Sequence, residues 1–471
     1  MDIEKLKGFI AKKWDESIVS ELSEYIKIPC QSPAFDPEWE KNRYFDQALD
    51  LMTAWCRKQD LTGLSLEVVK LEKRTPLLLI EVVGSGNRQD ETILLYGHLD
   101  KQPETEGWDD DKGPWKPVLQ ADKLYGRGGA DDGYAVFSAI SAIKALQEQG
   151  FSHARCVIII EACEESGSYD LPAYLDALKD RLGEPGLVVC LDSGCGNYDQ
   201  LWLTTSLRGF ISGNLSAHII TEGIHSGSGS GIVPSSFRIL RQILNRLEDA
   251  ETGKILIKEL NVEIDAGVAA EAKKAANVLG SDLKASYPFV EGAVAVSNEN
   301  NELVLNRTWR PALSYIGVNG FPKDGAVGNV LRPFSVLNLS LRLPPSINAE
   351  AVQNILKDVL EKDPPYQAEV NFKLQAAVSG WVAPKLESWL KDCLNSASQT
   401  YFGKEEIYMG EGGSIPFMNI LSNMFPKAQF VITGVLGPHS NAHGPNEFIH
   451  IPTAKKVTCC VAEVIKAFSS K

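Results

Sequence analysis

The sequence lacks the long apolar runs and the positive charge that membrane or nucleic-acid partners would require. No segment approaches the roughly 18 consecutive apolar residues of a membrane-spanning helix, and the first seven residues hold no apolar core of a secretion signal. The net charge is −14, which disfavours binding to nucleic acid or to an anionic membrane surface. We therefore expect neither partner, and we expect a cytoplasmic protein.

The sequence also lacks cysteines at the spacing of a metal site or a redox motif. The nine cysteines are an odd number and show no Cys-x-x-Cys spacing, so the sequence indicates neither a disulfide framework nor a closed structural zinc site. Several of them stand in apolar strands, among them Cys156 and Cys190, where cysteine acts as a small hydrophobe. These features favour reduced thiols. No internal repeat or low-complexity segment stands out.

The first 206 residues alternate between predicted strands and helices. Strands are expected at 65–70, 76–83 and 92–97, and a helix over 134–149 precedes a continuous apolar run at 156–161. Such runs suit strands that are buried on both faces of a sheet. The alternation predicts an α/β fold, in which helices flank both faces of a mixed sheet.

The pattern changes near Ser206. A long strand at 210–220 and a helix at 234–250 follow, and Phe334–Leu343 alternates between leucine and polar residues, which indicates a strand with one buried face. The order strand-helix-strand-strand-helix-strand outlines a separate α+β domain, with an insertion of short helices and loops at 251–312. We therefore divide the 471 residues into a catalytic domain made of 1–206 and 384–471 and an inserted domain at 207–383.

Two polar clusters stand out in the stretch from Glu91 to Gly133. His98 and Asp100 follow an apolar strand, and alternation places them on the same face of its end. About thirty residues later, Asp131 and Asp132 lie in a glycine-rich turn before the helix at 134–149. These side chains suit a divalent metal ion, although polar residues that merely cap and solubilise a loop would give the same pattern.

Three further pieces follow apolar strands, at whose ends α/β sheets place their ligands. They contain the adjacent carboxylates Glu164 and Glu165, the single Asp192, and two of the seven histidines, His439 and His443. Taken alone, each is more typical of a solvated loop, a turn or a helix cap. Together they supply histidines and carboxylates, a mixed donor set that suits Zn²⁺ or Mn²⁺. Two metal ions that share a carboxylate would lower the pKa of a bound water, and a spare carboxylate would take its proton.

At this point the whole chain resembles the M20 family of cocatalytic metallopeptidases, and within it the branch of cytosolic nonspecific dipeptidases and carnosinases. The resemblance rests on the order and spacing of six motifs: Gly97-His98-Leu99-Asp100, the run from Leu124 to Asp132, Glu164-Glu165-Ser166-Gly167, His225-Ser226-Gly227, the run from Glu411 to Pro416, and the run from Asn441 to Glu447.

The resemblance implies five ligands for two divalent metal ions, Zn²⁺ or Mn²⁺: His98 and Asp192 for one ion, Glu165 and His443 for the other, and Asp131 as the bridge. Asp100 would then hydrogen-bond the free ring nitrogen of His98, which fixes its tautomer. Glu164 would be the general base. The His-Gly-Pro-Asn-Glu run favours His443 over its neighbour His439 as the ligand.

In the family, the inserted domain is a lid through which two chains form a homodimer. His225 resembles the histidine that reaches the partner subunit's active site and stabilises the oxyanion. Arg342, Asn329 and Ser414 resemble residues that hold the substrate's free carboxylate and backbone. The sequence departs from the family at Gly133, where many members of this branch carry lysine, and at the less recognisable insertion 251–312.

The resemblance implies a hydrolase that cleaves dipeptides or short peptides with a free C-terminus. An N-acyl amino acid deacylase or a small carboxypeptidase would use the same metal ions and remains the alternative. A non-catalytic peptide-binding relative would have no need of Glu164, and a single structural metal would need neither so many carboxylates nor a base.

Overall fold

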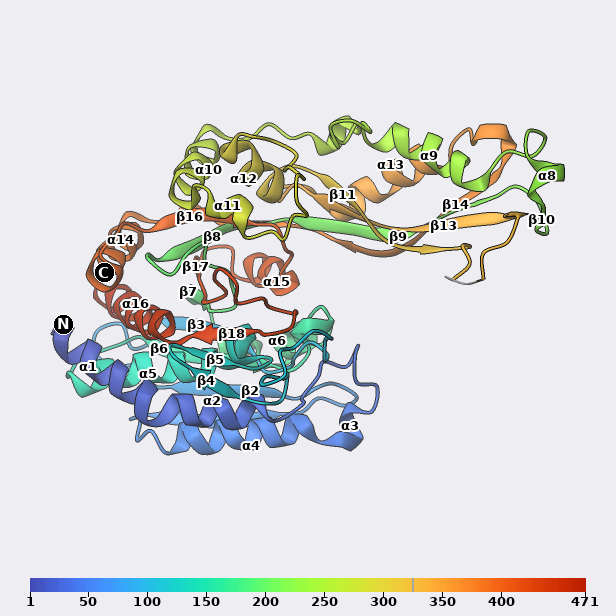
Figure 1. Cartoon of the computed structure of the whole chain (residues 1–471). Coiled ribbons are helices and arrows are strands. Elements are labelled where there is room, and N and C mark those ends of the chain that lie inside the picture. Colours follow the sequence, from blue (N-terminus) through green and yellow to red (C-terminus); the bar gives the residue numbers. More distant parts are fainter. Residues whose placement is uncertain (324–325) are drawn as a thin grey trace. The chain divides into compact units, whose positions relative to one another are not determined.

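The computed structural model describes residues 1–323 and 326–471, and it divides the chain into two compact units (Figure 1). The first unit contains Met1–Thr204, Ala383–Tyr408 and Ile420–Lys471, and the second contains Thr205–Val382 and Met409–Asn419. The chain thus enters and leaves the second unit near the predicted boundaries. It differs from the prediction at Met409–Asn419, which we had placed in the catalytic domain but which groups with the second unit.

The first unit is built on a six-stranded mixed sheet with the strand order β1-β2-β6-β3-β7-β17. These strands span Leu64–Val69 (β1), Leu77–Val82 (β2), Thr92–His98 (β3), Arg155–Glu161 (β6), Pro185–Cys190 (β7) and Gln429–Ile432 (β17). Strands β6, β3, β7 and β17 run parallel to one another, whereas β2 pairs in the antiparallel direction with both β1 and β6. The carboxyl ends of the four parallel strands therefore meet at one edge of the sheet.

Helices complete the first unit. They span Ile3–Lys13 (α1), Val19–Ile26 (α2), Trp39–Asn42 (α3), Tyr44–Arg57 (α4), Ala135–Glu148 (α5), Leu171–Ala177 (α6), Lys179–Leu182 (α7), Ser388–Phe402 (α14) and Ile451–Ser470 (α16). A small sheet of the same unit contains Val118–Gln120 (β4), Lys123–Tyr125 (β5) and Phe448–His450 (β18). Strands Trp202–Leu207 (β8) and Ile407–Glu411 (β16) and helix Pro416–Met424 (α15) run across the unit boundaries.

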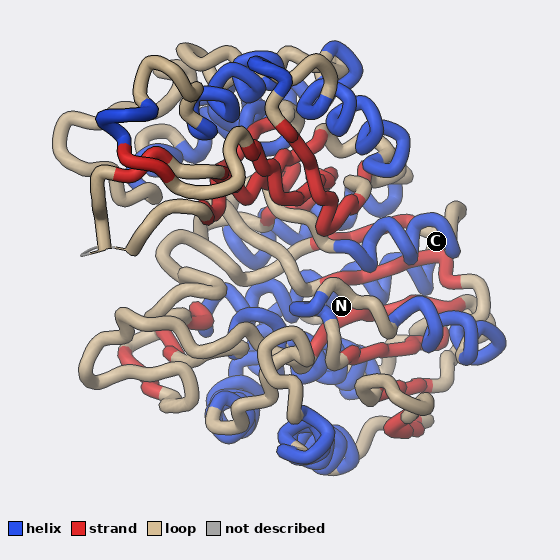
Figure 2. Tube along the Cα trace, turned by 90° about the vertical axis from the view of Figure 1, so that its right-hand side faces the viewer, coloured by secondary structure: helices blue, strands red, loops and turns tan. Residues whose placement is uncertain are grey.

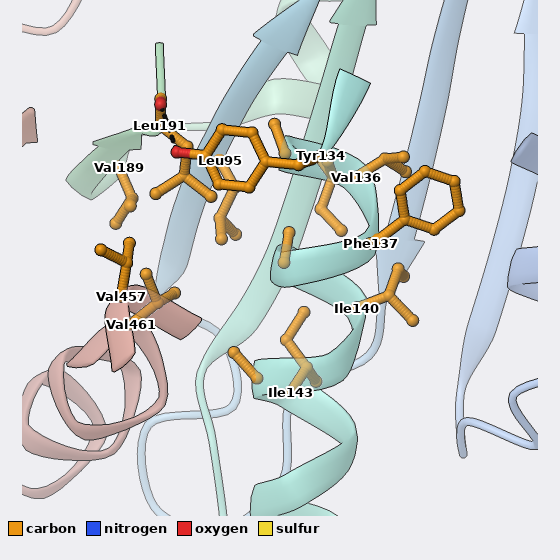
Figure 3. Packing of buried hydrophobic residues seen from close by; sticks show 14 of the residues in the cluster. Leu95, Tyr134, Val136, Phe137, Ile140, Ile143, Val189, Leu191, Val457 and Val461 are labelled. Carbon is orange, nitrogen blue, oxygen red and sulfur yellow. Dashed lines mark hydrogen bonds between the residues drawn. The ribbon is translucent and has the colours of Figure 1, made fainter. Parts of the chain in front are cut away.

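Helix α5 lies in the middle of the first unit's core and sets the position of the turn that precedes it. Its residues Val136, Phe137 and Ile140 are buried in one cluster with side chains of β3, β7 and α16. Figure 3 shows members of this cluster, with Val457 and Val461 of α16 on one side of α5 and Phe137 on the other. At the helix start, the hydroxyl of Tyr134 donates a 2.6 Å hydrogen bond to the main-chain oxygen of Leu191, just after β7 (Figure 3). The start of α5 and the end of β7 are thereby tied together.

The second unit contains a four-stranded antiparallel sheet with the order β11-β13-β9-β14. These strands span Gly209–His218 (β9), Ala312–Asn319 (β11), Phe334–Leu343 (β13) and Glu369–Val378 (β14). The leucines of β13 are buried, as the alternation predicted, and they pack with helices Ser236–Leu247 (α9) and Ala349–Glu361 (α13). Figure 2 shows helices of this unit on one side of its strands.

The remaining elements of the second unit are short or belong to the insertion. They span Ile224–His225 (β10), Ser226–Gly229 (α8), Ala266–Leu279 (α10), Asp282–Ala285 (α11), Asn300–Thr308 (α12), Val330–Leu331 (β12) and Trp381–Val382 (β15). The insertion is more regular than expected, because α10 has 14 residues. In the parts of the chain that the structure describes, no helix combines the length and the apolar character of a membrane span.

Candidate metal centre and substrate-binding residues

Three adjacent strand ends bring the predicted ligands of the first unit to one place. His98 is the last residue of β3 and pairs with Glu161, the last residue of β6. Glu164 and Glu165 lie in the turn that follows β6. On the other side, Cys190 of β7 pairs with Tyr96, so that Asp192, two residues further on, reaches the level of His98. The sequence predicted that polar residues would gather where these strands end, and the structure brings them together at this edge of the sheet.

Asp131 lies between two histidines. One of its carboxylate oxygens, Oδ1, is 3.2 Å from Nε2 of His98, and the other, Oδ2, is 3.0 Å from Nε2 of His443. His443 comes from the loop between β17 and β18, and its Nε2 also lies 3.4 Å from Oε2 of Glu165. A carboxylate that offers one oxygen to each of two histidines has the arrangement that a bridging metal ligand needs.

The other carboxylates complete two groups around His98. One group joins His98 with Asp131 and Glu165, and the other joins it with Glu164 and Asp192. In each group, ligand atoms from all three residues lie within 4.8 Å of one another. With His443, the structure thus brings all five predicted ligands and the predicted base into one cluster of side chains.

The electrostatics of this cluster suit a positive ion. Burial and the negative charge of neighbouring carboxylates raise the pKa of Glu164 and of Glu165 well above the usual value, and burial raises the pKa of Asp192 to about 6. Burial also acts on Asp131, but hydrogen bonds from His443 and His98 hold its pKa well below the usual range. Crowded carboxylates repel one another unless a cation compensates them. Divalent metal ions would relieve this repulsion, and the oxygen and imidazole donors fit Zn²⁺ or Mn²⁺.

The carboxylate of Asp100 does not make the hydrogen bond to the ring nitrogen of His98 that was predicted for it. Its carboxylate accepts hydrogen bonds from the backbone N–H groups of Glu164, at 3.1 Å, and Glu165, at 2.9 Å. The hydrogen-bonding partner of His98 Nδ1 is instead the main-chain oxygen of Asp100, at 3.0 Å, while the carboxylate oxygen is 3.6 Å away. The residue still determines the orientation of the ring, but its carboxylate mainly holds the turn of the two glutamates.

Gln102 belongs to the site but was not predicted from the sequence. Its side-chain Nε2 donates a 2.5 Å hydrogen bond to Oε2 of Glu165. Gln102 follows Asp100 by two residues, and this spacing was the only sign of its role, because glutamine carries no charge and forms no metal-binding pattern of its own. The amide fixes Oε2 of Glu165, the same oxygen that lies 3.4 Å from Nε2 of His443.

Gly133, where the sequence departs from its family, lies against α2. A Cβ atom at this position would come within 2.2 Å of Cε1 of Tyr25 and 2.7 Å of the main-chain oxygen of Gly128. The buried ring of Tyr25 therefore leaves no room for a side chain. His439, the histidine that we did not choose as a ligand, is exposed.

In the second unit, His225 and Asn329 lie on neighbouring segments. His225 belongs to β10, which pairs with β12, and the N–H of Ser226 donates a 2.8 Å hydrogen bond to the main-chain oxygen of Asn329. Both side chains are exposed. A Cβ atom on Gly227 would come within 2.9 Å of Cε1 of His225, the outer end of an exposed ring.

Arg342 and Ser414 also meet within the second unit. Nη1 of Arg342 donates a 3.3 Å hydrogen bond to Oγ of Ser414, and that hydroxyl donates to the main-chain oxygen of Arg208. Arg342 lies on the face of β13 opposite the buried leucines, as predicted, and its guanidinium stands 5.4 Å from the ring of Phe210. It therefore keeps further donors for a ligand, and guanidinium matches carboxylate geometry.

Arg208 was not predicted, although it supports this pair. It is 8% exposed, and its guanidinium donates to three main-chain oxygens, those of Gly412, Asn306 and Arg310. Burial and the nearby charges of Arg342 and Arg307 lower the pKa of Arg208 to about 10. A buried guanidinium that donates to three carbonyl groups adds positive charge beside Arg342 and favours an anionic ligand. The available sign in the sequence was a charged residue two positions before the predicted strand at 210–220.

Comparisons with known proteins show the family of this chain. The model of peptidase family M20/M25/M40 matches residues 94–467. The chain is 27% identical over 465 residues to the cysteinylglycine-S-conjugate dipeptidase of Corynebacterium striatum, covering 96% of each protein, and 27% identical over 480 residues to the human β-Ala-His dipeptidase, covering 96% of this chain and 91% of the relative. The solved structure of the dipeptidase Dug1p from Saccharomyces cerevisiae superposes with a TM-score of 0.78 at 20% identity, over 100% of this chain and 99% of the other.

The structural likeness confirms the predicted fold class, and the family match covers most of the chain, including every predicted metal ligand. The chain belongs to the peptidase family M20/M25/M40, within the dipeptidase and carnosinase branch that its motifs predicted, and it is a metallopeptidase.

Proposed function

We propose that this protein hydrolyses the peptide bond of dipeptides, or of short peptides with a free C-terminus, at a site for two divalent metal ions. The observation that carries the proposal is the position of Asp131, whose two carboxylate oxygens face Nε2 of His98 and Nε2 of His443. The names of relatives that align over nearly the whole chain, the cysteinylglycine-S-conjugate and β-Ala-His dipeptidases, support dipeptides as the substrate class.

The proposed ligands are His98 and Asp192 for one ion, Glu165 and His443 for the other, and Asp131 for both, with Zn²⁺ or Mn²⁺ as the metal. When bound, the metal ions would lower the pKa of a water molecule and polarise the scissile carbonyl group. The chain's own part is to hold these side chains in place. Asp100 and Gln102 do so through their hydrogen bonds to the turn of the two glutamates.

Glu164 is the proposed general base. Its backbone N–H is fixed by Asp100, while its neighbour Glu165 has the bond to Gln102 and the contact to His443. The two adjacent glutamates thus have different environments, which suits Glu165 as a metal ligand and Glu164 as the base. In this role the carboxylate of Glu164 accepts a proton from the attacking water and passes it to the amine that leaves.

The second unit is the proposed lid and dimerisation domain. Arg342, Ser414 and Asn329 would hold the substrate's free carboxylate and backbone, supported by the charge of Arg208. His225 would stabilise the oxyanion in the active site of the partner subunit of a homodimer. The exposure of His225 on its glycine-flanked turn supports this role, because nothing within its own turn buries the ring. We further propose a cytoplasmic location, since the nine cysteines are all free.

A hydrolysis screen tests the substrate class. The protein, stripped of metal with a chelator, is reloaded with Zn²⁺, Mn²⁺ or Co²⁺ and assayed on dipeptides, on peptides of four to six residues and on N-acetyl amino acids. We expect hydrolysis only after reloading, and faster hydrolysis of dipeptides than of the other classes. Preferred cleavage of N-acetyl amino acids would establish the deacylase alternative, and release of single C-terminal residues from longer peptides would establish a carboxypeptidase.

A further inference from the structure

Arg127 and Glu447 form a buried ion pair beside the proposed metal centre, and neither residue is among the proposed ligands. Glu447 is fully buried, and Arg127 is 1% exposed. Nη1 of Arg127 donates to Oε2 of Glu447, and the N–H of Gly128 donates to Oε1 at 2.8 Å. The N–H of Gly126 donates to the main-chain oxygen of Glu447 at 2.9 Å. Glu447 is therefore bonded to three consecutive residues of the glycine-rich turn.

This pair joins the two segments that supply Asp131 and His443. Asp131 follows Gly128 closely along the turn, and His443 precedes Glu447 in the loop between β17 and β18. The side chains of Asp131 and His443 meet at 3.0 Å. The distance between these segments thus depends on a bond made a few residues away from the ligands.

The loop that carries His443 has little regular structure to hold it. Four of its residues that are not glycine adopt positive φ angles: His439, Asn441, His443 and Asn446. Such residues visit the left-handed region at a cost in energy unless surrounding bonds hold them there. The buried carboxylate of Glu447 is the charged anchor at the end of this loop.

Arg127 also connects the pair to the segment that follows Gln102. Its Nη2 donates to Oγ1 of Thr105 at 3.0 Å and lies 3.4 Å from the main-chain oxygen of Pro103. Gln102, next to Pro103, donates to Glu165. The guanidinium of Arg127 therefore links three segments, and these segments contact or contain Asp131, Glu165 and His443.

Stability alone gives a poor account of this pair. The desolvation of two buried charges often exceeds their attraction, and apolar replacements of similar volume are often neutral or stabilising. A guanidinium–carboxylate bond does, however, fix geometry more strictly than apolar packing does. We propose that the Arg127–Glu447 pair is a positioning device, which holds His443 against Asp131 and Glu165 and so sets the affinity of the metal position that these residues form. The inference rests on the proposed two-metal site but not on the proposed substrate.

Metal binding without substrate tests this role. Chelator-stripped wild type and Glu447→Gln are titrated with Mn²⁺ in competition with a metal-sensing dye, which resolves the two binding steps. Glutamine keeps the size and one acceptor oxygen but removes the charge. We expect one binding step to weaken by about 10–100-fold, the range for residues that orient metal ligands, while the other stays unchanged. Turnover should recover when Mn²⁺ is raised to saturation.

Glu81→Gln is the matched control. Glu81 also accepts hydrogen bonds from arginine, namely from Arg155 at 2.6 Å and from Arg181. It lies within β2 opposite Val157, four residues before the end of β6 that faces the site. This variant loses a carboxylate–arginine bond of the same kind. Both of its metal-binding steps should equal those of wild type.

A second variant separates positioning from folding. Arg127→Met combined with Glu447→Leu removes the pair without leaving a buried charge alone, so we expect it to fold even where Glu447→Gln does not. It should show the same selective loss of one binding step. The inference is overturned if this double variant binds both ions like wild type, or if Glu81→Gln weakens binding equally. Wild type that binds two ions but cleaves no dipeptide would refute the proposed function and leave this inference intact.

Discussion

The carboxylate of Asp100 accepts a 2.9 Å hydrogen bond from the backbone N–H of Glu165. Its other oxygen accepts from the N–H of Glu164 at 3.1 Å, and its main-chain oxygen lies 3.0 Å from Nδ1 of His98. Asp100, which is fully buried, therefore orients the ring of His98, a proposed ligand. It also holds the turn that contains Glu165, another proposed ligand, and Glu164, the proposed base. Its two functions are carried by two different groups, the carboxylate and the main-chain carbonyl.

Replacing Asp100 with asparagine should impair the site without unfolding the protein. The amide keeps one acceptor, but its NH₂ group would face one of the two N–H donors, so the turn of the glutamates must shift. We expect kcat to fall by about 10–100-fold together with metal affinity. Steady-state kinetics and metal titration measure this loss. Asp170→Asn is the control, since Asp170 is also buried and accepts from the N–H of Thr75. Unchanged kinetics in Asp100→Asn would contradict the role.

The sequence predicted the features that depend on a single strand and on the residues directly after it. Apolar runs located the parallel strands, and the polar residues after them lie together at the candidate site, because parallel strands end at one edge. The alternation in Phe334–Leu343 likewise predicted both the buried leucines and the accessible face of Arg342, since side chains alternate strictly along a strand.

Contacts between segments far apart in the chain were not predictable in the same way. The carboxylate of Asp100 bonds to a turn more than sixty residues later, and the guanidinium of Arg208 donates to the oxygen of Gly412, about two hundred residues later. No local pattern encodes such partners. The assignment of Met409–Asn419 to the second unit was missed for a similar reason, because this segment joins that unit through distant contacts.

Arg342→Ala should remove the preference for a free C-terminus. A guanidinium binds a carboxylate through paired hydrogen bonds that an amide cannot reproduce. We expect wild type to cleave dipeptide amides at least about 10-fold more slowly than free dipeptides, because bonds to charged groups contribute about 1.5–3 kcal/mol. The variant should treat both substrates alike. Arg246→Ala, which removes a half-buried arginine bonded to the main-chain oxygens of Lys362 and Asp363, should leave the preference intact. Equal wild-type rates on both substrates would refute this role.

His225→Ala should lower kcat by about 10²–10³-fold, the effect of losing one oxyanion donor. If each His225 completes the site of the partner subunit, a mixture of His225→Ala and Glu164→Gln chains should recover activity after subunit exchange. Random exchange makes half the dimers hybrids, each with one whole site, so about a quarter of wild-type activity should return. Mass-tagged chains verify the exchange. No recovery despite verified exchange would mean that His225 acts within its own chain or not at all.

Glu164→Gln tests the central claim, which is a general base beside a two-metal site, most directly. Glutamine retains the shape of the side chain but cannot accept the proton, so turnover of a dipeptide should fall by at least about 10²–10⁴-fold. Metal content, measured on the same sample by elemental analysis, should stay near two ions per chain, as in wild type. Glu165→Gln should differ by losing metal as well as rate. A Glu164→Gln protein that holds its metal and still turns over dipeptides at a substantial rate would contradict the assignment.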